Sequence, residues 1–221
     1  MNLLRSLERQ TYKMYTVPIY LADADSTDHT RDTATLLASR LNLLGFKIIP
    51  GGLPAVGRNA GAKLAKTRYL LFLDADVVLE DDTFVERVIQ EMRAKGLHCA
   101  TTDVHCPEGK WLSKVAYGIS NFYQRGSRFF GTPFATGMCM FFERRVFYNL
   151  DGFHEGALFA EDYLLSKQVR WRRFRVIKGG VATSDRRMQK MGYWKLAKLF
   201  FGTALLSHRS NQFLKDHGYW H

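Results

Sequence analysis

A short, uninterrupted apolar run that ends on two carboxylates constrains this sequence most. Residues 69–73 read YLLFL, and Asp74-Ala75-Asp76 follows directly. A continuous apolar run of this length is typical of a strand buried on both faces, inside a sheet that helices cover on both sides. We therefore expect the two aspartates at the carboxyl end of an interior strand, which is the edge where open α/β sheets bind ligands.

Strand-like and helix-like segments alternate along the rest of the chain. The strand candidates are 17–22, 46–49, 98–102, 138–142 and 174–178, and the helix candidates are 28–44, 54–66, 82–95 and 161–173. This alternation predicts an α/β fold with three layers, a Rossmann-like and mostly parallel sheet with helices on both faces. With no repeat or Gly/Ser linker, the simplest division is one domain over 1–192 and a basic, aromatic, amphipathic tail over 193–221.

The chain is strongly basic, and the charge is unevenly distributed. Lys and Arg number 32 against 21 Asp and Glu, which gives a net charge of +11. Such a surface attracts nucleic acid, anionic lipid or phosphorylated substrates, and net charge does not choose among them. Acidic residues gather at 23–32 and 74–91, whereas the chain is basic from Lys110 onward. No nucleic-acid-binding motif occurs, so nucleic acid is not an expected partner. The alternative to a polyanion-binding surface is a basic face that is simply solvated.

The cysteines and the hydropathy of the chain indicate the cellular compartment in which the protein is expected. Cys99, Cys106 and Cys139 form neither a CxxC pair nor a zinc-site spacing, so packing is their expected role and a reducing cytoplasm the expected compartment. The sequence shows no signal peptide and no spanning run of ~18 apolar residues. The tail mixes aromatic and basic residues as a helix lying on an anionic bilayer does, which predicts contact with the inner face of the membrane; packing on the core is the alternative.

Asp74 and Asp76 are the metal candidates. Two carboxylates spaced i, i+2 at a strand end can face one hard cation, and Mg²⁺ or Mn²⁺ accepts such ligands while keeping positions for water or phosphate oxygens. The alternative is an ordinary solvated turn at the end of the strand.

Two further segments carry groups suited to a nucleotide. The acidic turn 23–28 reads DADSTD after a strand, so it can accept hydrogen bonds from a base or ribose or simply cap the next helix. In the segment 57–61, Arg58 offers a planar fork for phosphate or ribose oxygens between small neighbours, although an Arg on a helix surface is the common case.

Two later segments carry groups suited to catalysis. Glu161-Asp162 opens a helix after Gly152-Phe153, and a carboxylate there can deprotonate an acceptor hydroxyl, unless it is only an acidic first turn. Arg186-Arg187 lies on a loop after the last strand, where it can close over a diphosphate leaving group or remain a plain basic loop.

In this order, the segments resemble family 2 glycosyltransferases of the GT-A fold. The matching features are a D-x-x-S-T-D turn, an R-N-x-G segment, a strand ending in DxD, a Gly-Phe turn and a Glu-Asp pair, and they run from about Leu3 to Arg187. The resemblance implies an inverting transfer from a nucleoside-diphosphate sugar, a UDP-sugar by default, to a hydroxyl acceptor, for which a lipid-linked acceptor or a cell-envelope glycan is the candidate.

The resemblance also assigns roles to individual residues. Asp162 is the implied catalytic base, Glu161 its support, and Asp76 with Asp74 the metal ligands. The implied nucleotide-sugar-binding residues, taken with the loop arginines, are Asp23, Asp25, Arg58, Asn59, Asp74, Ala75, Gly137, Arg186 and Arg187.

The chain departs from the family pattern in three places. Family members open with an additional strand, whereas this chain opens in the helix expected to follow it. The acidic turn reads Asp-Ala-Asp-Ser where Asp-Asp-Gly-Ser is commoner. The segment 168–171, QVRW, has the wrong spacing for the signature of processive members, so we predict no processive polymerase.

Two other functions fit part of the pattern. Residues 71–78 superficially fit the nucleophile strand of haloacid-dehalogenase-type phosphohydrolases, with Asp74 attacking phosphate and Asp76 as acid/base, but the later lysine and paired aspartates of that family are not obvious. A catalytically dead basic module that binds membrane or nucleic acid is the other alternative.

Overall fold

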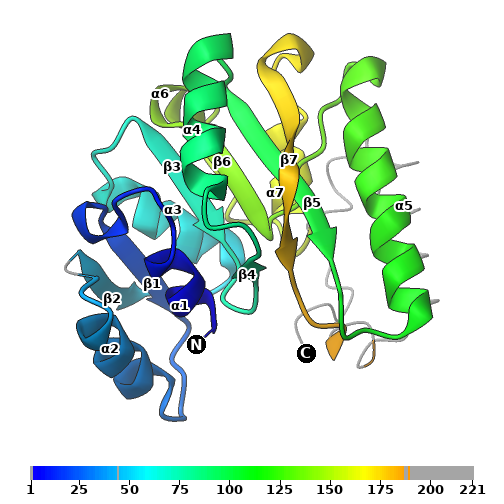
Figure 1. Ribbon diagram of the computed structural model, residues 1–221. Helices are drawn as coiled ribbons and strands as arrows, with labels where there is room; N and C mark the ends of the chain where they lie inside the picture. Colours follow the sequence, from blue (N-terminus) through cyan, green and yellow to red (C-terminus); the bar gives the residue numbers. More distant parts are fainter. Residues whose placement is uncertain (1, 44, 187–188, 190–221) are drawn as a thin grey trace.

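The computed structural model describes residues 2–43, 45–186 and 189, and Figure 1 shows their arrangement. The elements in chain order are α1 (Asn2–Glu8), η1 (Met14–Thr16), β1 (Ile19–Asp23), α2 (Thr30–Arg40), β2 (Phe46–Pro50), α3 (Pro54–Leu64), β3 (Tyr69–Leu73), β4 (Val78–Leu79), α4 (Phe84–Lys95), β5 (Cys99–His105), α5 (Trp111–Ser127), η2 (Arg128–Phe130), β6 (Cys139–Glu143), α6 (Arg144–Asn149), α7 (Glu161–Ser166), η3 (Trp171–Arg173) and β7 (Phe174–Ala182).

The strands form two sheets. β1 and β2 pair in parallel as a two-stranded sheet, and the five-stranded sheet has the order β3-β6-β5-β7-β4. β6 runs antiparallel to both β3 and β5, β4 runs antiparallel to β7, and β5 and β7 are parallel. The larger sheet is thus more mixed than the alternation along the chain predicts, because β6 is inserted between two strands that share a direction.

Two apolar cores lie on opposite faces of the larger sheet. Phe141 of β6 packs in the core that contains α1 and α4, whereas Met140 and Phe142 pack in the core that contains α3 and α6. Successive strand residues point to opposite faces, so this division places helices on both sides of the sheet. The predicted three-layer α/β/α arrangement is confirmed.

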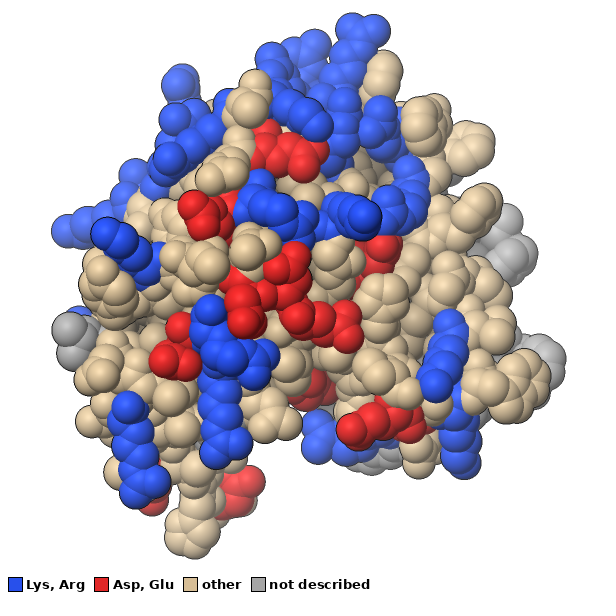
Figure 2. Space-filling view, viewed as in Figure 1, with Lys and Arg blue, Asp and Glu red and all other residues tan. Residues whose placement is uncertain are grey.

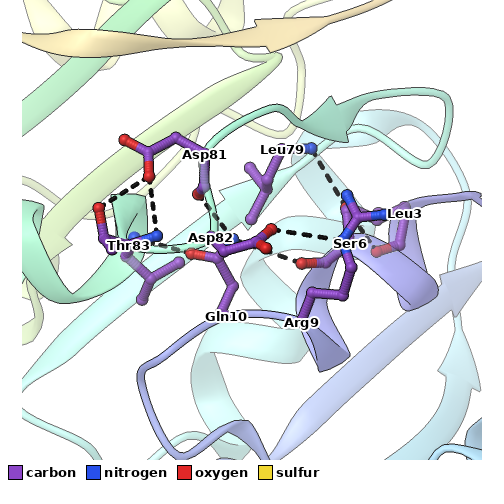
Figure 3. Close-up of polar contacts among 9 residues, drawn as sticks. Leu3, Ser6, Arg9, Gln10, Leu79, Asp81, Asp82 and Thr83 are labelled. Carbon is purple, nitrogen blue, oxygen red and sulfur yellow. Dashed lines mark hydrogen bonds and ion pairs between the residues drawn. The ribbon is translucent and has the colours of Figure 1, made fainter.

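Polar contacts fasten α1 to the loop between β4 and α4 (Figure 3). The Ser6 hydroxyl accepts from the Leu79 amide at 3.2 Å. The Gln10 side chain donates to the Asp81 carbonyl at 2.9 Å and accepts from the Val85 amide at 3.0 Å. Because Gln10 is buried, its bond satisfies the Val85 amide inside the protein, and it adds a second donor to the Asp81 carbonyl, which also accepts from the Phe84 amide at 3.1 Å.

Local signals place most elements to within a few residues. The β3 strand has the predicted bounds, and α4 ends at Gly96, whose φ of 57° is the left-handed conformation expected just after a helix. The helix predicted over 161–173 instead ends at Ser166 and is followed by the η3 turn. α5 is an amphipathic helix that the sequence analysis did not identify.

All three cysteines are buried, which confirms their expected packing role. Within the described residues, no helix has the length and apolar character needed to cross a bilayer. The predicted tail over 193–221 and Arg187 lie outside the described residues.

Candidate active site

The Asp23 carboxylate occupies a closed turn at the carboxyl end of β1. Its side chain is 4% exposed and accepts from the Ser26 amide at 3.2 Å, the Ser26 hydroxyl at 2.5 Å and the Arg31 guanidinium. The Ser26 hydrogen bond, with those from Arg31 and the Ser26 amide, lowers the pKa of Asp23. Asp25, in the left-handed region with φ 58°, is exposed and receives the other arm of Arg31 at 2.9 Å.

The two sheets meet at the first turns of α3. A Cβ added to Gly57 would lie 2.9 Å from the Ala22 Cβ of β1, so the absence of a side chain at Gly57 lets α3 press against the end of β1. Arg58 follows directly and reaches toward the larger sheet. Its side chain is 12% exposed, and its guanidinium lies 5.3 Å from the centre of the Phe153 ring.

Arg58 gathers carboxylates from two distant segments. One arm donates to Asp74 at 2.6 Å and to the Gly137 carbonyl at 3.2 Å, and the other donates to Glu161 at 2.5 Å. Burial opposes the charged guanidinium, yet Asp74, Glu161 and Asp162 together raise the pKa of Arg58. One guanidinium thus faces three carboxyl groups, and the cluster carries excess negative charge when they are ionised.

Asp162 is held by two backbone amides. Its Oδ2 accepts from the Gly137 amide at 2.6 Å, and its Oδ1 accepts from the Tyr163 amide, in the first turn of α7, at 2.8 Å. Burial, followed by the charge of Glu161, raises the pKa of Asp162 to about 7, against the lowering effect of Arg58 and the two amides. A carboxyl group that titrates near neutrality is poised to exchange a proton at physiological pH.

Gly137 allows this close approach. A Cβ at this position would lie 2.8 Å from an Arg58 nitrogen and 3.1 Å from the Asp162 Oδ2. Its amide and carbonyl therefore link the carboxylate of Asp162 with the guanidinium of Arg58, and any side chain would push the two apart.

Asn59 links α3 to the glycine-phenylalanine turn. Its amide nitrogen donates to the Phe153 carbonyl at 2.8 Å and to Glu155 at 2.9 Å, while its oxygen accepts from the Phe153 amide at 3.0 Å. Asn59 is 9% exposed, so its amide is committed to this contact in the structure.

The other predicted site residues lie at the open side of the cluster. Ala75 and Asp76 are exposed, and Arg186 lies 3.8 Å from Asp76. The Arg186 side chain is 81% exposed. Its neighbour Asp185 accepts from the Lys110 amide at 3.1 Å and from the Ser113 hydroxyl at 2.9 Å, which fixes the loop to the start of α5.

The donor set at the end of β3 fits a hard divalent cation. Asp76 is 40% exposed at its side chain and Asp74 24%, so both carboxylates are open to the surface. Among the described residues, no three His, Cys, Asp or Glu side chains are grouped to hold a metal ion. A cation held by Asp74 and Asp76 would therefore take its other ligands from water and phosphate oxygens, as Mg²⁺ sites with few protein ligands do.

The family model for "Glycosyl transferase family 2" matches residues 2–151 of this sequence. The chain belongs to glycosyltransferase family 2. This membership favours the glycosyltransferase interpretation of the Asp74-Ala75-Asp76 strand over the phosphohydrolase alternative. A search of curated proteins found no match.

Solved structures support the fold of this family 2 chain. A mannosyltransferase from Pyrobaculum calidifontis, PcManGT, in complex with GDP-Man and Mn²⁺, superposes with a TM-score of 0.68 at 16% identity, over 96% of this chain and 59% of that one. Residues 1–349 of S. aureus TarS give 0.62 at 17% identity, over 90% and 60%. The same TarS fragment in complex with UDP-GlcNAc gives 0.59 at 16%, over 83% and 54%. The chain spans about three-fifths of the first two.

Sequence reasoning missed two residues that shape the site, Arg31 and Gln124, and it noted Phe153 only as part of the glycine-phenylalanine turn. Arg31 bridges Asp23 and Asp25, and Phe153 packs under the Arg58 guanidinium. Gln124 of α5 is 1% exposed; its side chain accepts from the Thr136 amide at 2.9 Å and donates to the Thr102 carbonyl of β5 at 2.8 Å. These two bonds hold the loop that precedes Gly137 next to α5 and β5. Of the two missed residues, only Arg31 had a local signal, its position in the first turn of α2 between Asp28 and Asp32.

Proposed function

We propose that this chain is a metal-dependent inverting glycosyltransferase. It moves a sugar from a nucleoside-diphosphate sugar, a UDP-sugar by default, to a hydroxyl acceptor that is lipid-linked or part of a cell-envelope glycan. The observation that carries the proposal is the cluster around Arg58, whose guanidinium binds Asp74 and Glu161. In the same cluster, the Asp162 carboxylate accepts hydrogen bonds from the backbone amides of Gly137 and Tyr163. Family 2 membership supports it.

Asp162 is the proposed catalytic base. Its carboxylate accepts the proton of the acceptor hydroxyl as that oxygen attacks the anomeric carbon, and the sugar–phosphate bond breaks on the opposite face. Its pKa of about 7 makes it a stronger base than a solvated carboxylate, while part of the population stays ionised at neutral pH. Glu161 and Arg58 orient it, and Asn59 positions α3 on the Phe153 turn.

The nucleotide end of the donor is assigned to the open edge of the two sheets. Asp23 and Asp25 are proposed to bind the base or ribose, and Arg186 with Arg187 to offset charge on the leaving diphosphate. Arg58, Ala75 and Gly137 are proposed to line the sugar-diphosphate region. Mn²⁺ or Mg²⁺ bound at Asp74 and Asp76 would neutralise charge on the diphosphate.

Isothermal titration of UDP and of GDP, with and without Mn²⁺, tests this function. We expect metal-dependent binding of one nucleotide that Asp76→Ala abolishes. Asp32→Ala is the matched control, because the Asp32 side chain is 90% exposed on α2 and should leave binding unchanged. A folded wild-type sample that binds neither nucleotide in either condition contradicts the proposal.

A further inference from the structure

The outward face of α5 is apolar rather than polar. Its exposed large side chains recur at spacings of four, four and three residues, which places them on one helical stripe. These residues and their exposed fractions are Trp111 at 71%, Val115 at 49%, Ile119 at 65% and Phe122 at 81%. On the side of α5, Figure 2 shows uncharged side chains next to a column of basic ones. Isolated exposed apolar residues are normal, but a continuous stripe of this kind marks an interaction surface.

The stripe extends past the end of α5. The η2 turn that follows exposes Phe129 by 74% and Phe130 by 83%, and η2 packs beside η3, where Trp171 is 41% exposed. We call the exposed residues of α5, η2 and η3 together the α5 face. It combines aliphatic side chains with large aromatic ones, including tryptophan at both ends.

Cations flank the α5 face, and acids are missing from its sequence. No Asp or Glu occurs from residue 109 to residue 142, while Lys110, Lys114 and Arg128 lie along that stretch. Burial, then the charge of Arg175 in β7, lowers the pKa of Arg128. The positive charge at the end of α5 therefore continues into the neighbouring strand.

A row of basic residues runs from the end of α5 along the edge of the larger sheet at which β3, β5 and β7 begin and β6 ends. Backbone hydrogen bonds connect the row: the Arg144 amide donates to the Arg68 carbonyl at 2.8 Å, and the His98 amide to the Arg173 carbonyl at 2.8 Å. Figure 2 shows the corresponding blue band across the top of the molecule, over the ends of α4 and β7. We call it the basic row, and its members are Arg68, Arg93, Lys95, Arg144, Arg145, Arg170, Arg172, Arg173 and Arg175.

The basic row is only weakly neutralised. Within the part of the chain that the structure describes, its ion pairs are Arg68 with Glu143 at 3.6 Å and Lys95 with Glu91 at 2.7 Å. Of the other cations, Arg173 donates to the Lys95 and Gly96 carbonyls and Arg175 to the Phe174 carbonyl, so their positive charge is not neutralised by a carboxylate among the described residues.

We infer that the α5 face and the basic row together dock this protein on an anionic lipid bilayer. Aromatic and aliphatic side chains enter the boundary between headgroups and acyl chains, and the flanking cations bind the anionic headgroups. Charge argues against a second copy as the occupant, because a two-fold interface on this face would bring the basic residues toward their own symmetry mates. The inference does not depend on the proposed function.

Vesicle co-sedimentation of the full chain tests the docking surface. Wild-type protein should bind phosphatidylglycerol-containing vesicles and bind pure phosphatidylcholine vesicles at least tenfold more weakly. The triple variant Trp111→Ser, Phe122→Ser, Phe130→Ser should lose at least tenfold in affinity for the anionic vesicles. The matched control is Tyr15→Ser, Leu36→Ser, Leu64→Ser, which removes apolar residues of 53%, 54% and 48% exposure elsewhere and should bind as wild type does.

A second pair of variants tests the basic row. Arg170→Gln with Arg172→Gln should weaken binding to anionic vesicles about tenfold and reduce its dependence on salt, whereas Arg40→Gln with Lys63→Gln should not. All four cations are exposed, so circular dichroism should show unchanged melting in every variant.

Four outcomes overturn the inference. Equal binding to both vesicle types, or unchanged binding by the α5 triple variant, removes the membrane role of this face. A dimer that becomes a monomer in that variant, seen by light scattering without vesicles, assigns the face to a second copy. A lower melting temperature of that variant with unchanged vesicle binding means that the chain itself covers the face.

Discussion

At the scale of single residues, Arg58 determines the geometry of the acidic cluster. Its guanidinium presents a planar fork that serves Asp74 and Glu161 at once, which the point charge of a lysine cannot do. Without it, these carboxylates and Asp162 would face one another with no counter-charge in a largely buried site. Because Gly57 has no side chain, α3 packs closely against the end of β1, and the neighbouring Arg58 places its guanidinium between β3 and α7.

Replacing Asp162 by Asn should slow turnover and spare donor binding. The amide cannot accept a proton from the acceptor, so we expect a loss of about 10²–10⁴-fold, the usual contribution of a general base. Release of nucleoside diphosphate from a panel of UDP- and GDP-sugars, with water as the acceptor, measures the rate, and titration measures binding. Asp32→Asn is the control. Near-normal turnover in Asp162→Asn would assign the base elsewhere.

The raised pKa of Asp162 predicts a pH dependence for both rate and stability. The base must be ionised to accept a proton, so turnover should increase with pH as a single ionisation with a pKa of about 7. The folded chain holds this proton more tightly than the unfolded chain, whose Asp titrates at about 3.9. The stabilising contribution of Asp162 is therefore complete below pH of about 3.9 and is lost as pH rises through about 7. Denaturant titrations across this pH range measure the free energy of unfolding of the wild type and of Asp162→Asn. The decrease with pH that Asp162 contributes should occur in the wild type and be absent from the variant.

At the scale of elements, polar side chains decide how short helices dock. α1 has only a few buried apolar side chains, and Ser6 and Gln10 bind it to β4 and α4. The sequence indicates α1 as an amphipathic helix but gives no sign of its partner. Besides a local bond to the Ser6 carbonyl, the Gln10 side chain bonds to residues more than seventy positions away.

Gln10→Ala should destabilise the fold. It removes the acceptor of the buried Val85 amide, and a buried group left without a partner costs about 1–3 kcal/mol. The Asp81 carbonyl loses the Gln10 donor but keeps the hydrogen bond from the Phe84 amide at 3.1 Å. We expect a free energy of unfolding lower by about 1–3 kcal/mol in urea titrations. Arg9→Ala is the control: its ion pair with Asp82 is half exposed and should contribute less than about 1 kcal/mol. Equal effects of the two variants would contradict this account of α1.

At the scale of the whole molecule, the two sheets differ in how they are supported. β5 pairs on both sides within the larger sheet, whereas among the described residues β1 and β2 have strand partners only in each other. A two-stranded sheet is marginal unless helices pack on it, and α2 and α3 provide that packing here. Asp23, on the smaller sheet, and Asp74, on the larger one, therefore belong to parts of unequal stability.

Hydrogen exchange should reveal this inequality. Amides of β5 are expected to exchange far more slowly than those of β1 and β2, because opening of the small sheet does not require the larger one to unfold. If both sheets contribute to one nucleotide site, UDP or GDP with Mn²⁺ should slow exchange in β1. Equal protection of β1 and β5 without ligand would show that the sheets open as one unit.

The sequence by itself determined the local features of this protein. The YLLFL run placed β3, Gly96 ended α4, and the order of the acidic and basic motifs identified the family, because each of these signals depends on residues close together in the chain. Tertiary structure decided the rest. The insertion of β6 between β3 and β5, the binding of Arg58 to Asp74 and Glu161, and the exposure of the apolar stripe of α5 depend on which distant segments pack together. Periodicity states which face of an element is apolar, but not which neighbour covers it.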